Sequence, residues 1–164
     1  MAESVKYLVK LEGGTAFLVV CGRASYLNCK SCGEFFDYIV RKNCTEVKID
    51  FSQCQGMDST FMGMIASLAL KMRELNLEGG VSLYNLSERN RELVENLGLD
   101  ALVKMGGELD FKLDNAQTLE AQPASKWSIL NAHKKLVEID SGNASKFQDV
   151  IAFLQKAQSE EDKL

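Results

Sequence analysis

Three groups of residues in this sequence have types and spacings that can carry chemistry. Cys29 and Cys32 form a CxxC, the spacing of a redox dithiol or of half a zinc site. His133 is the only histidine, so a serine or cysteine nucleophile would have to use it as its base. Ser59 is the middle residue of an Asp-Ser-Thr triplet at 58–60, where a strand-like run gives way to a helical one. The candidates are therefore redox or metal chemistry at the cysteines, nucleophilic catalysis with His133, and a functional serine at the start of a helix.

The CxxC fits packing better than catalysis. Zinc would need two more ligands at suitable spacing, and the sequence has no second CxxC. Cys32 also shares a helical face with three apolar residues, Phe35, Phe36 and Ile39. We expect structural thiols, and we keep a small thiol oxidoreductase using Cys29 and Cys32 as the enzymatic alternative. That alternative requires an exposed cysteine with a lowered pKa.

The other routes to catalysis find little support. His133 stands alone in the last third of the chain, so we expect it to be solvated or packed and to take no part in a nucleophilic triad. The sequence has no GxGxxG and no Walker-type lysine, and its glycine pairs at 13–14, 79–80 and 106–107 are typical of turns. We expect no enzyme, no cofactor and no metal.

Composition limits the class of protein. The chain has 164 residues, 46% of them apolar and 26% charged, which is typical of a globular domain with a core. A net charge of -4 predicts no nucleic-acid surface and no polybasic membrane patch. Neither a long apolar span nor the apolar region of a signal peptide is visible. Five scattered cysteines, an odd number, fit a reducing compartment, so we expect a cytoplasmic protein.

The elements that would position these residues alternate along the chain. Apolar and β-branched runs predict strands, and spacings of three and four predict helices. We expect strands at 5–10, 16–21, 46–51 and 81–84, a short apolar stretch at 102–111, and helices at 27–41, from 58 onward and at 88–97. A hairpin followed by αβ alternation predicts an α/β fold, with helices packed on a mixed sheet of four to five strands.

The last fifty or so residues read as an extension. Residues 114–123 are polar, contain the only proline and are expected to form a linker. Helices are expected at 126–139 and 146–158, the second capped by Ser145 and Gln148. The second helix carries an apolar stripe of Phe147, Val150, Ile151 and Leu154. We expect the stripe to pack on the domain, with a homodimer through these helices as the alternative, and we divide the chain into 1–114 and 115–164.

The junction between strand and helix holds a more specific pattern. Capping accounts for Asp58, but it does not account for Met57 in an otherwise polar loop. The junction resembles the signature of STAS domains, the family of bacterial anti-sigma-factor antagonists. In that signature an apolar strand ending in Asp precedes a loop and then Met-Asp-Ser-Ser/Thr at a helix start. The matching positions here are Asp50, Met57, Asp58, Ser59 and Thr60.

The resemblance covers residues 4–112 and has two departures. Gly22-Arg23 after the hairpin and Asn85-Leu86-Ser87 before a later helix are similar to the family in order and kind. Many members have glycine directly after the Ser-Ser/Thr pair, whereas this chain has Phe61 there and a glycine only at Gly63. The extension also lies outside the family pattern.

The resemblance implies a protein-binding switch in transcription regulation. Ser59 would be the phosphoacceptor of a partner that is both anti-sigma factor and serine kinase. The unphosphorylated chain would bind that partner, phosphorylation would release it, and a serine phosphatase would reset the cycle. Asp58 would orient the Ser59 hydroxyl or assist recognition. The contact would be made by Arg23, Met57, Asp58, Thr60 and Asn85. The alternative within binding modules is a STAS scaffold or a lipid- or nucleotide-responsive module in which Ser59 is never modified.

Overall fold

The strand-like and helical runs assemble into a mixed sheet with helices on it. The structure is a computed structural model that describes residues 5–109 and 113–162. Its strands are β1 (Lys6–Glu12), β2 (Thr15–Ala24), β3 (Glu46–Met57), β4 (Gly80–Tyr84), β5 (Lys104–Met105) and β6 (Gln117–Leu119). Its helices are α1 (Lys30–Arg41), α2 (Ser59–Glu74), α3 (Glu88–Asn96), α4 (Lys126–Ile139) and α5 (Asn143–Asp162), with a 3-10 turn at Leu99–Ala101.

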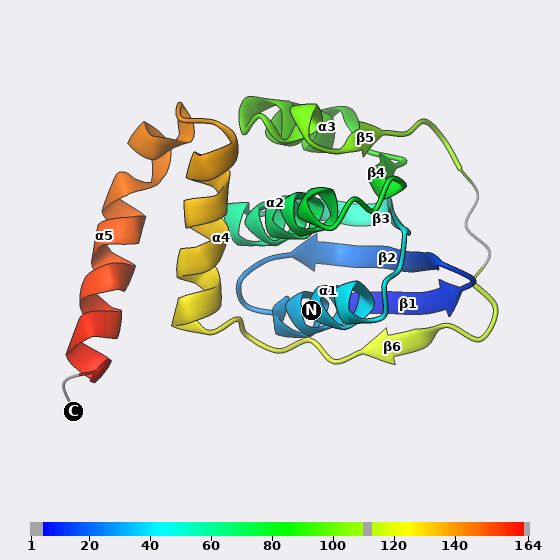
Figure 1. Ribbon diagram of the computed structural model, residues 1–164, viewed down its shortest axis with the longest axis horizontal. Coiled ribbons are helices and arrows are strands. Elements are labelled where there is room, and N and C mark those ends of the chain that lie inside the picture. Colours follow the sequence, from blue (N-terminus) through cyan, green and yellow to red (C-terminus); the bar gives the residue numbers. More distant parts are fainter. Residues whose placement is uncertain (1–4, 110–112, 163–164) are drawn as a thin grey trace.

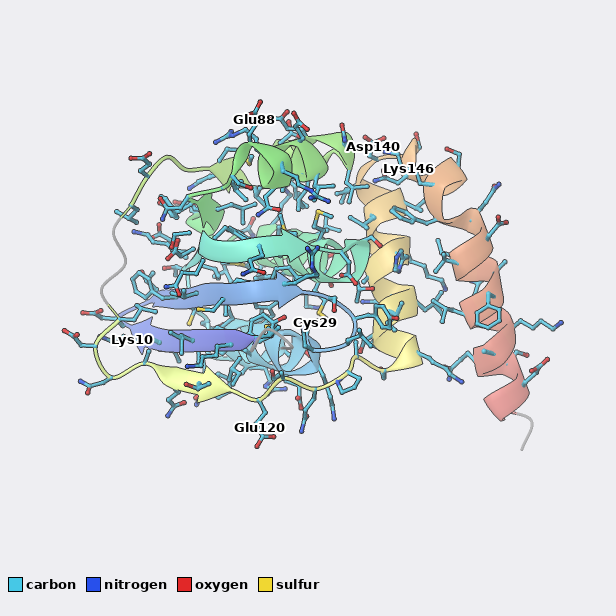
Figure 2. The ribbon with its side chains drawn as sticks, turned by 180° about the vertical axis from the view of Figure 1, so that it is seen from behind. Lys10, Cys29, Glu88, Glu120, Asp140 and Lys146 are labelled. Atoms are coloured by element: carbon cyan, nitrogen blue, oxygen red, sulfur yellow. The ribbon has the colours of Figure 1, made fainter. Side chains whose placement is uncertain are left out.

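The sheet order is β5-β4-β3-β2-β1-β6. β1 pairs with β2 as an antiparallel hairpin, β2, β3, β4 and β5 are parallel neighbours, and β6 returns antiparallel to β1. Figure 1 shows α1 and α2 in front of the sheet, and Figure 2 shows its strands from behind. This confirms the predicted mixed α/β fold, with one strand more than expected.

The extra strand lies in the segment expected to be a linker. β6 pairs Leu119 with Tyr7 at the sheet edge. Beyond β6, the Gln122 carbonyl accepts from Lys30 N at 3.0 Å. The segment 114–123, expected to be a linker, thus contains a strand, because its backbone finds hydrogen-bond partners on β1 and at the start of α1.

β3 is also longer than predicted. Its pairing with β2 shifts register between Val19 and Cys21 and again between Gly22 and Arg23. Such bulges take up extra residues without ending a strand. The polar segment 52–56, expected to be a loop, therefore continues β3 up to the residue before Asp58. Of the expected apolar stretch at 102–111, only β5 is a strand, and residues 110 and 111 lie outside the described residues.

α4 and α5 follow the predicted positions, with a different start for α5. α4 spans the expected residues, but α5 begins at Asn143, and Ser145 donates to the Gly142 carbonyl instead of capping. The predicted capping box was therefore wrong. Figure 1 shows α4 lying between α5 and the first part of α2. Among the described residues, no helix is both long and apolar enough to cross a membrane.

The core explains why α2 is apolar on more than one side. α1 buries the predicted face, including Cys32 and Phe36, against the sheet. The first turns of α2 are buried nearly all round, because the sheet covers one side and α4 covers another. Leu136 of α4 is fully buried and belongs to the same core as the sheet. The extension is therefore packed into the core.

Candidate functional site at the start of helix α2

Asp58 fixes the start of α2. Its backbone N–H donates to the Ala24 carbonyl at 3.0 Å, which ties it to the end of β2. Its Oδ1 accepts from Phe61 N at 3.0 Å, and its Oδ2 accepts from Tyr26 N at 2.8 Å. Asp58 is thus the predicted N-cap and also holds the chain between β2 and α1. Its two carboxylate oxygens accept from these backbone N–H groups. The prediction that Asp58 orients the Ser59 hydroxyl or assists recognition stays a prediction.

The Ser59 hydroxyl instead meets a residue from the extension. Its Oγ lies 2.8 Å from Nε2 of His133, 74 residues further along the chain. The other ring nitrogen, Nδ1, lies 2.7 Å from the carbonyl oxygen of Ile129. Since a carbonyl can only accept, Nδ1 carries the proton, and in the neutral ring Nε2 accepts from the Ser59 hydroxyl.

The histidine is held firmly in place. His133 is 4% exposed, and its ring packs edge-on against Phe147 of α5 at 5.0 Å between centroids. Packing of His133 was expected, but its hydrogen bond to Ser59 was not. Because the ring is fixed at both nitrogens and by Phe147, the Ser59 hydroxyl has one defined partner inside the protein.

A glycine lets α4 come this close. A Cβ added to Gly63 would lie 2.3 Å from the backbone oxygen of Ala132, which is a steric clash. Ala132 is 1% exposed and precedes His133. The glycine delayed to position 63 therefore has a structural reason: it admits the backbone of α4 one turn beyond Ser59.

A hollow of about 540 Å³ opens beside the Ser59–His133 pair. Its walls include Tyr26, Ile129 and Phe153, which make it largely apolar, and the carboxylates Asp58 and Asp149. Ser59 is half-buried and forms part of the wall. Among the described residues, no lysine or arginine lines the hollow, so a phosphate placed there would lie near two carboxylates without either of these basic side chains in the wall.

Comparison with known proteins places this site in a known fold. No model of a protein family matches the sequence, and no curated protein matches it. Among the solved structures that match, three have TM-scores of 0.50 to 0.52. The anti-sigma factor antagonist SpoIIAA in its unphosphorylated form is 14% identical, and the match covers 63% of this chain and 89% of that one. The chain has the STAS fold.

The other two matches agree. The Bacillus cell fate determinant SpoIIAA in its phosphorylated form is 14% identical over 63% of this chain and 92% of that one. The protein TM1081 is 18% identical over 61% of this chain and 79% of that one. More than a third of this chain thus lies outside each match. The predicted resemblance is confirmed at the level of fold.

The predicted contact residues fall into two groups. Met57 is 6% exposed and Thr60 is 2% exposed, so in this conformation their side chains offer a partner almost no surface. Arg23 is exposed, and its guanidinium lies over Gly56. We therefore do not assign Met57 and Thr60 a partner contact in the function proposed below.

Asn85 serves a polar cluster on the STAS sheet. It adopts a left-handed backbone, with φ of 59°, and its Nδ2 donates to Asp50 Oδ1 at 2.8 Å and to the Leu109 carbonyl at 2.7 Å. Asp50 is buried and also accepts from Ser52 N at 2.9 Å. A buried carboxylate requires such partners. The hydrogen bond between Asn85 and Asp50 therefore connects the loop after β4 to β3.

The CxxC lies in the interior of the protein. Cys29 and Cys32 are 0% exposed. Burial raises the pKa of Cys29 to about 12 and that of Cys32 well above its ordinary value. A redox nucleophile needs an exposed thiol with a lowered pKa. Among the described residues, no group of three or more His, Cys, Asp or Glu is placed to hold a metal ion. The thiol oxidoreductase alternative therefore lacks the site that it requires.

Proposed function

We propose that this STAS domain is a partner-binding switch of the anti-sigma-factor-antagonist kind, with Ser59 as its phosphoacceptor. In the unphosphorylated state it binds an anti-sigma factor that is also a serine kinase. Phosphorylation of Ser59 releases that partner, and a serine phosphatase restores binding. The cycle would regulate transcription in a bacterium.

The position of the Ser59 hydroxyl carries this proposal. It lies in the first turn of α2, is half-buried, and is bound by a side chain of another element. Its neighbour Thr60 is buried, so Ser59 is the better acceptor of the two. Two of the matched structures are of SpoIIAA, one in its unphosphorylated and one in its phosphorylated form. That protein is an anti-sigma factor antagonist, and a phosphorylated form on the same fold supports the proposal.

Local electrostatics explain how a phosphate would act here without unfolding the domain. The first backbone N–H groups of a helix lack intrahelical partners and tolerate an anion. A phosphate adds about -1.5 to -2 charges. On Ser59 that charge would lie beside Asp58 and Asp149 at the hollow. A partner surface shaped for a hydroxyl would then have to desolvate a dianion, so the loss would appear in binding.

The test compares two substitutions in the same assay. The anti-sigma-factor kinases of the source organism would be purified and titrated with Ser59→Ala and Ser59→Asp. We expect Ser59→Asp to bind the kinase at least about 100-fold more weakly than Ser59→Ala does, the ratio that roughly 3 kcal/mol produces. Thr60→Val serves as the control, because that side chain is buried and should leave affinity near that of the parent. Equally tight binding by both Ser59 variants would contradict the switch.

Exposed apolar side chains of α5 beside the hollow favour a second candidate, a scaffold in which Ser59 is not modified. Phe153 is 71% exposed and Val150 is 41% exposed on the same helix. Exposed apolar side chains of this size are common in protein contacts, including contacts between two copies of one chain. For such a scaffold, Phe153→Ser would abolish a homodimer seen by sedimentation, and phosphosite mapping would find Ser59 unmodified. A monomeric parent would contradict the homodimer.

A further inference from the structure

The Ser59 face of α2 is already occupied by the protein's own chain. α4 crosses the first turns of α2 and places His133 on the Ser59 hydroxyl, and α5 packs behind α4 (Figure 1). We propose that α4 and α5 form an internal cover over this face, which opens as a unit while the sheet and α1 to α3 stay folded. The inference rests on the proposed function only for what binds the uncovered face.

The cover is anchored at its far end by a set of polar contacts. Asn143 is fully buried, and its Nδ2 donates to the carbonyls of Leu97 at 2.9 Å and Leu136 at 2.7 Å. Lys146 Nζ donates to the Asn96 carbonyl at 2.7 Å. Asn96 and Leu97 lie at the end of α3, where the last carbonyls lack helical partners and a cation is favourable. The bond from Asn143 to Leu136 lies within the cover, because Leu136 belongs to α4. Figure 2 shows Lys146 beside α3 at this corner.

The middle of the cover depends on close backbone packing. At Gly63 and Ala132 the two helices approach so closely that one added methyl group would overlap the α4 backbone. The contact is therefore specific, and a single methyl group at Gly63 would push α4 outward. By contrast, a Cβ added to Gly33 in α1 would lie 3.5 Å from the nearest atom, an ordinary van der Waals distance. The two glycines provide a matched pair of substitutions.

The chain before α4 supplies a fixed attachment. β6 is paired with β1, and Ala124 N donates to the Tyr26 carbonyl at 2.7 Å. Lifting α4 and α5 therefore breaks none of the strand pairings of the sheet. It breaks the Ser59–His133 hydrogen bond, the Gly63 packing and the anchors of Asn143 and Lys146. It also uncovers Leu136 and the part of the core that Leu136 covers. These are the losses expected of a separate opening unit.

The cover sets a condition on any protein that acts on Ser59. A kinase must hold the hydroxyl in its own active site, and a hydroxyl hydrogen-bonded to a buried ring under a helix cannot be so held. A folded partner and α4 therefore compete for the same face. Binding requires the open form, so apparent affinity is reduced by the fraction of molecules that are open.

The experiment measures access to position 59 without kinase or partner. Ser59→Cys would be combined with Gly63→Ala or Gly33→Ala in the full chain. The probe is a maleimide carrying a long polyethylene glycol chain, too large for the hollow. The parent chain, which keeps Ser59, gives the background from the five native cysteines. Amide hydrogen exchange would be followed in parallel in α4, β2 and β3.

Compared with Ser59→Cys alone, Gly63→Ala should increase the rate at which the thiol at position 59 is modified by at least about tenfold, the ratio that 1.4 kcal/mol produces. In Gly63→Ala, amide hydrogen exchange should rise in α4 but not in β2 and β3. Gly33→Ala should change neither the thiol modification nor the hydrogen exchange. Lys146→Ala, a milder loss of one anchor, should give a smaller change in the same direction.

Two results would overturn the cover. One is a thiol at position 59 that reacts equally fast with and without Gly63→Ala. The other is exchange in β2 and β3 that rises together with exchange in α4 in both opening variants, Gly63→Ala and Lys146→Ala. No kinase is used in this experiment. A failure of the cover therefore leaves the proposed phosphorylation of Ser59 untouched, and an unphosphorylated Ser59 would likewise leave the cover untouched.

Discussion

Two helices that follow strands, α1 after β2 and α2 after β3, start with residues that could do chemistry. At the start of α1, Cys29 forms no side-chain capping bond and Cys32 is buried in the core. At the start of α2, Asp58 caps the helix and Ser59 lies at the edge of a hollow under His133. The first site is closed by the core, and the second is closed by the C-terminal extension.

The difference shows that the neighbours of a motif decide its chemistry. Burial raises the pKa of Cys29, and the nearby Asp58 carboxylate adds to the rise. The Ser59 hydroxyl keeps a polar partner and a path to solvent, because the element over it is a helix with a histidine and not the sheet. The following predictions test this contrast, beginning with the largest effect.

The first prediction tests whether α4 belongs to the core. Leu136→Ala removes a fully buried side chain and should lower the free energy of unfolding by about 2–5 kcal/mol. Phe153→Ala on the exposed face of α5 is the control and should change it by about 0.5 kcal/mol or less. Urea titrations followed by circular dichroism give both values. A Leu136→Ala loss as small as that of the control would mean that α4 is not part of the core.

The second prediction concerns how α2 is held. Asp58→Ala removes the cap and the bond to Tyr26 N, and should cost about 2 kcal/mol. Ser87→Ala removes only the cap of α3 and should cost about 1 kcal/mol. The same urea titrations measure both changes. An Asp58→Ala cost no greater than that of Ser87→Ala would show that the Tyr26 bond contributes nothing.

The third prediction isolates the Ser59–His133 hydrogen bond. A double-mutant cycle with Ser59→Ala and His133→Ala should give a coupling energy of about 1 kcal/mol. A second cycle with Ser31→Ala and His133→Ala should give none, because Ser31 binds the Glu120 carbonyl at the start of α1. Coupling of equal size in the two cycles would argue against a specific contact.

The fourth prediction has the smallest effect at neutral pH. Cys29 and Cys32 should resist iodoacetamide at about pH 8 in the native protein, while the half-buried Cys21 and Cys54 react first. The pKa of Cys29 rises from 9.0 to about 12 on folding, so the folded state holds that proton more tightly. The stability linked to it is full below the ordinary pKa of 9.0 and is lost as the pH rises towards about 12. Peptide mapping by mass spectrometry and melting curves at rising alkaline pH test both points, and fastest labelling at Cys29 would contradict them.

Local patterns in the sequence were sufficient for most of the fold. Alternation and helical spacing predicted four strands, two of them as the hairpin, and all five helices, since those signals lie within each segment. β6 was missed because it has three residues, only one of them apolar, and is stabilised by pairing with β1 far away in sequence. The length of β3 was missed because bulges follow from its pairing with β2.

Only part of the candidate site was predicted from the sequence. Asp58 and Ser59 were found because strand, cap and helix are adjacent in sequence. His133 was not placed there, since its contact with Ser59 joins residues 74 apart. One signal pointed to it: Gly63 lies inside an otherwise strong helical pattern, and a glycine there indicates close approach of another backbone.

The most direct test of the account is phosphosite mapping on protein purified from its own cells, with phosphatase inhibitors present. The parent, Gly63→Ala and Gly33→Ala would be compared at equal expression. The account predicts phosphate on Ser59, at an occupancy that rises in Gly63→Ala and stays at the parental value in Gly33→Ala. Ser59 without phosphate in all three, across several growth conditions, would contradict its role as the switch.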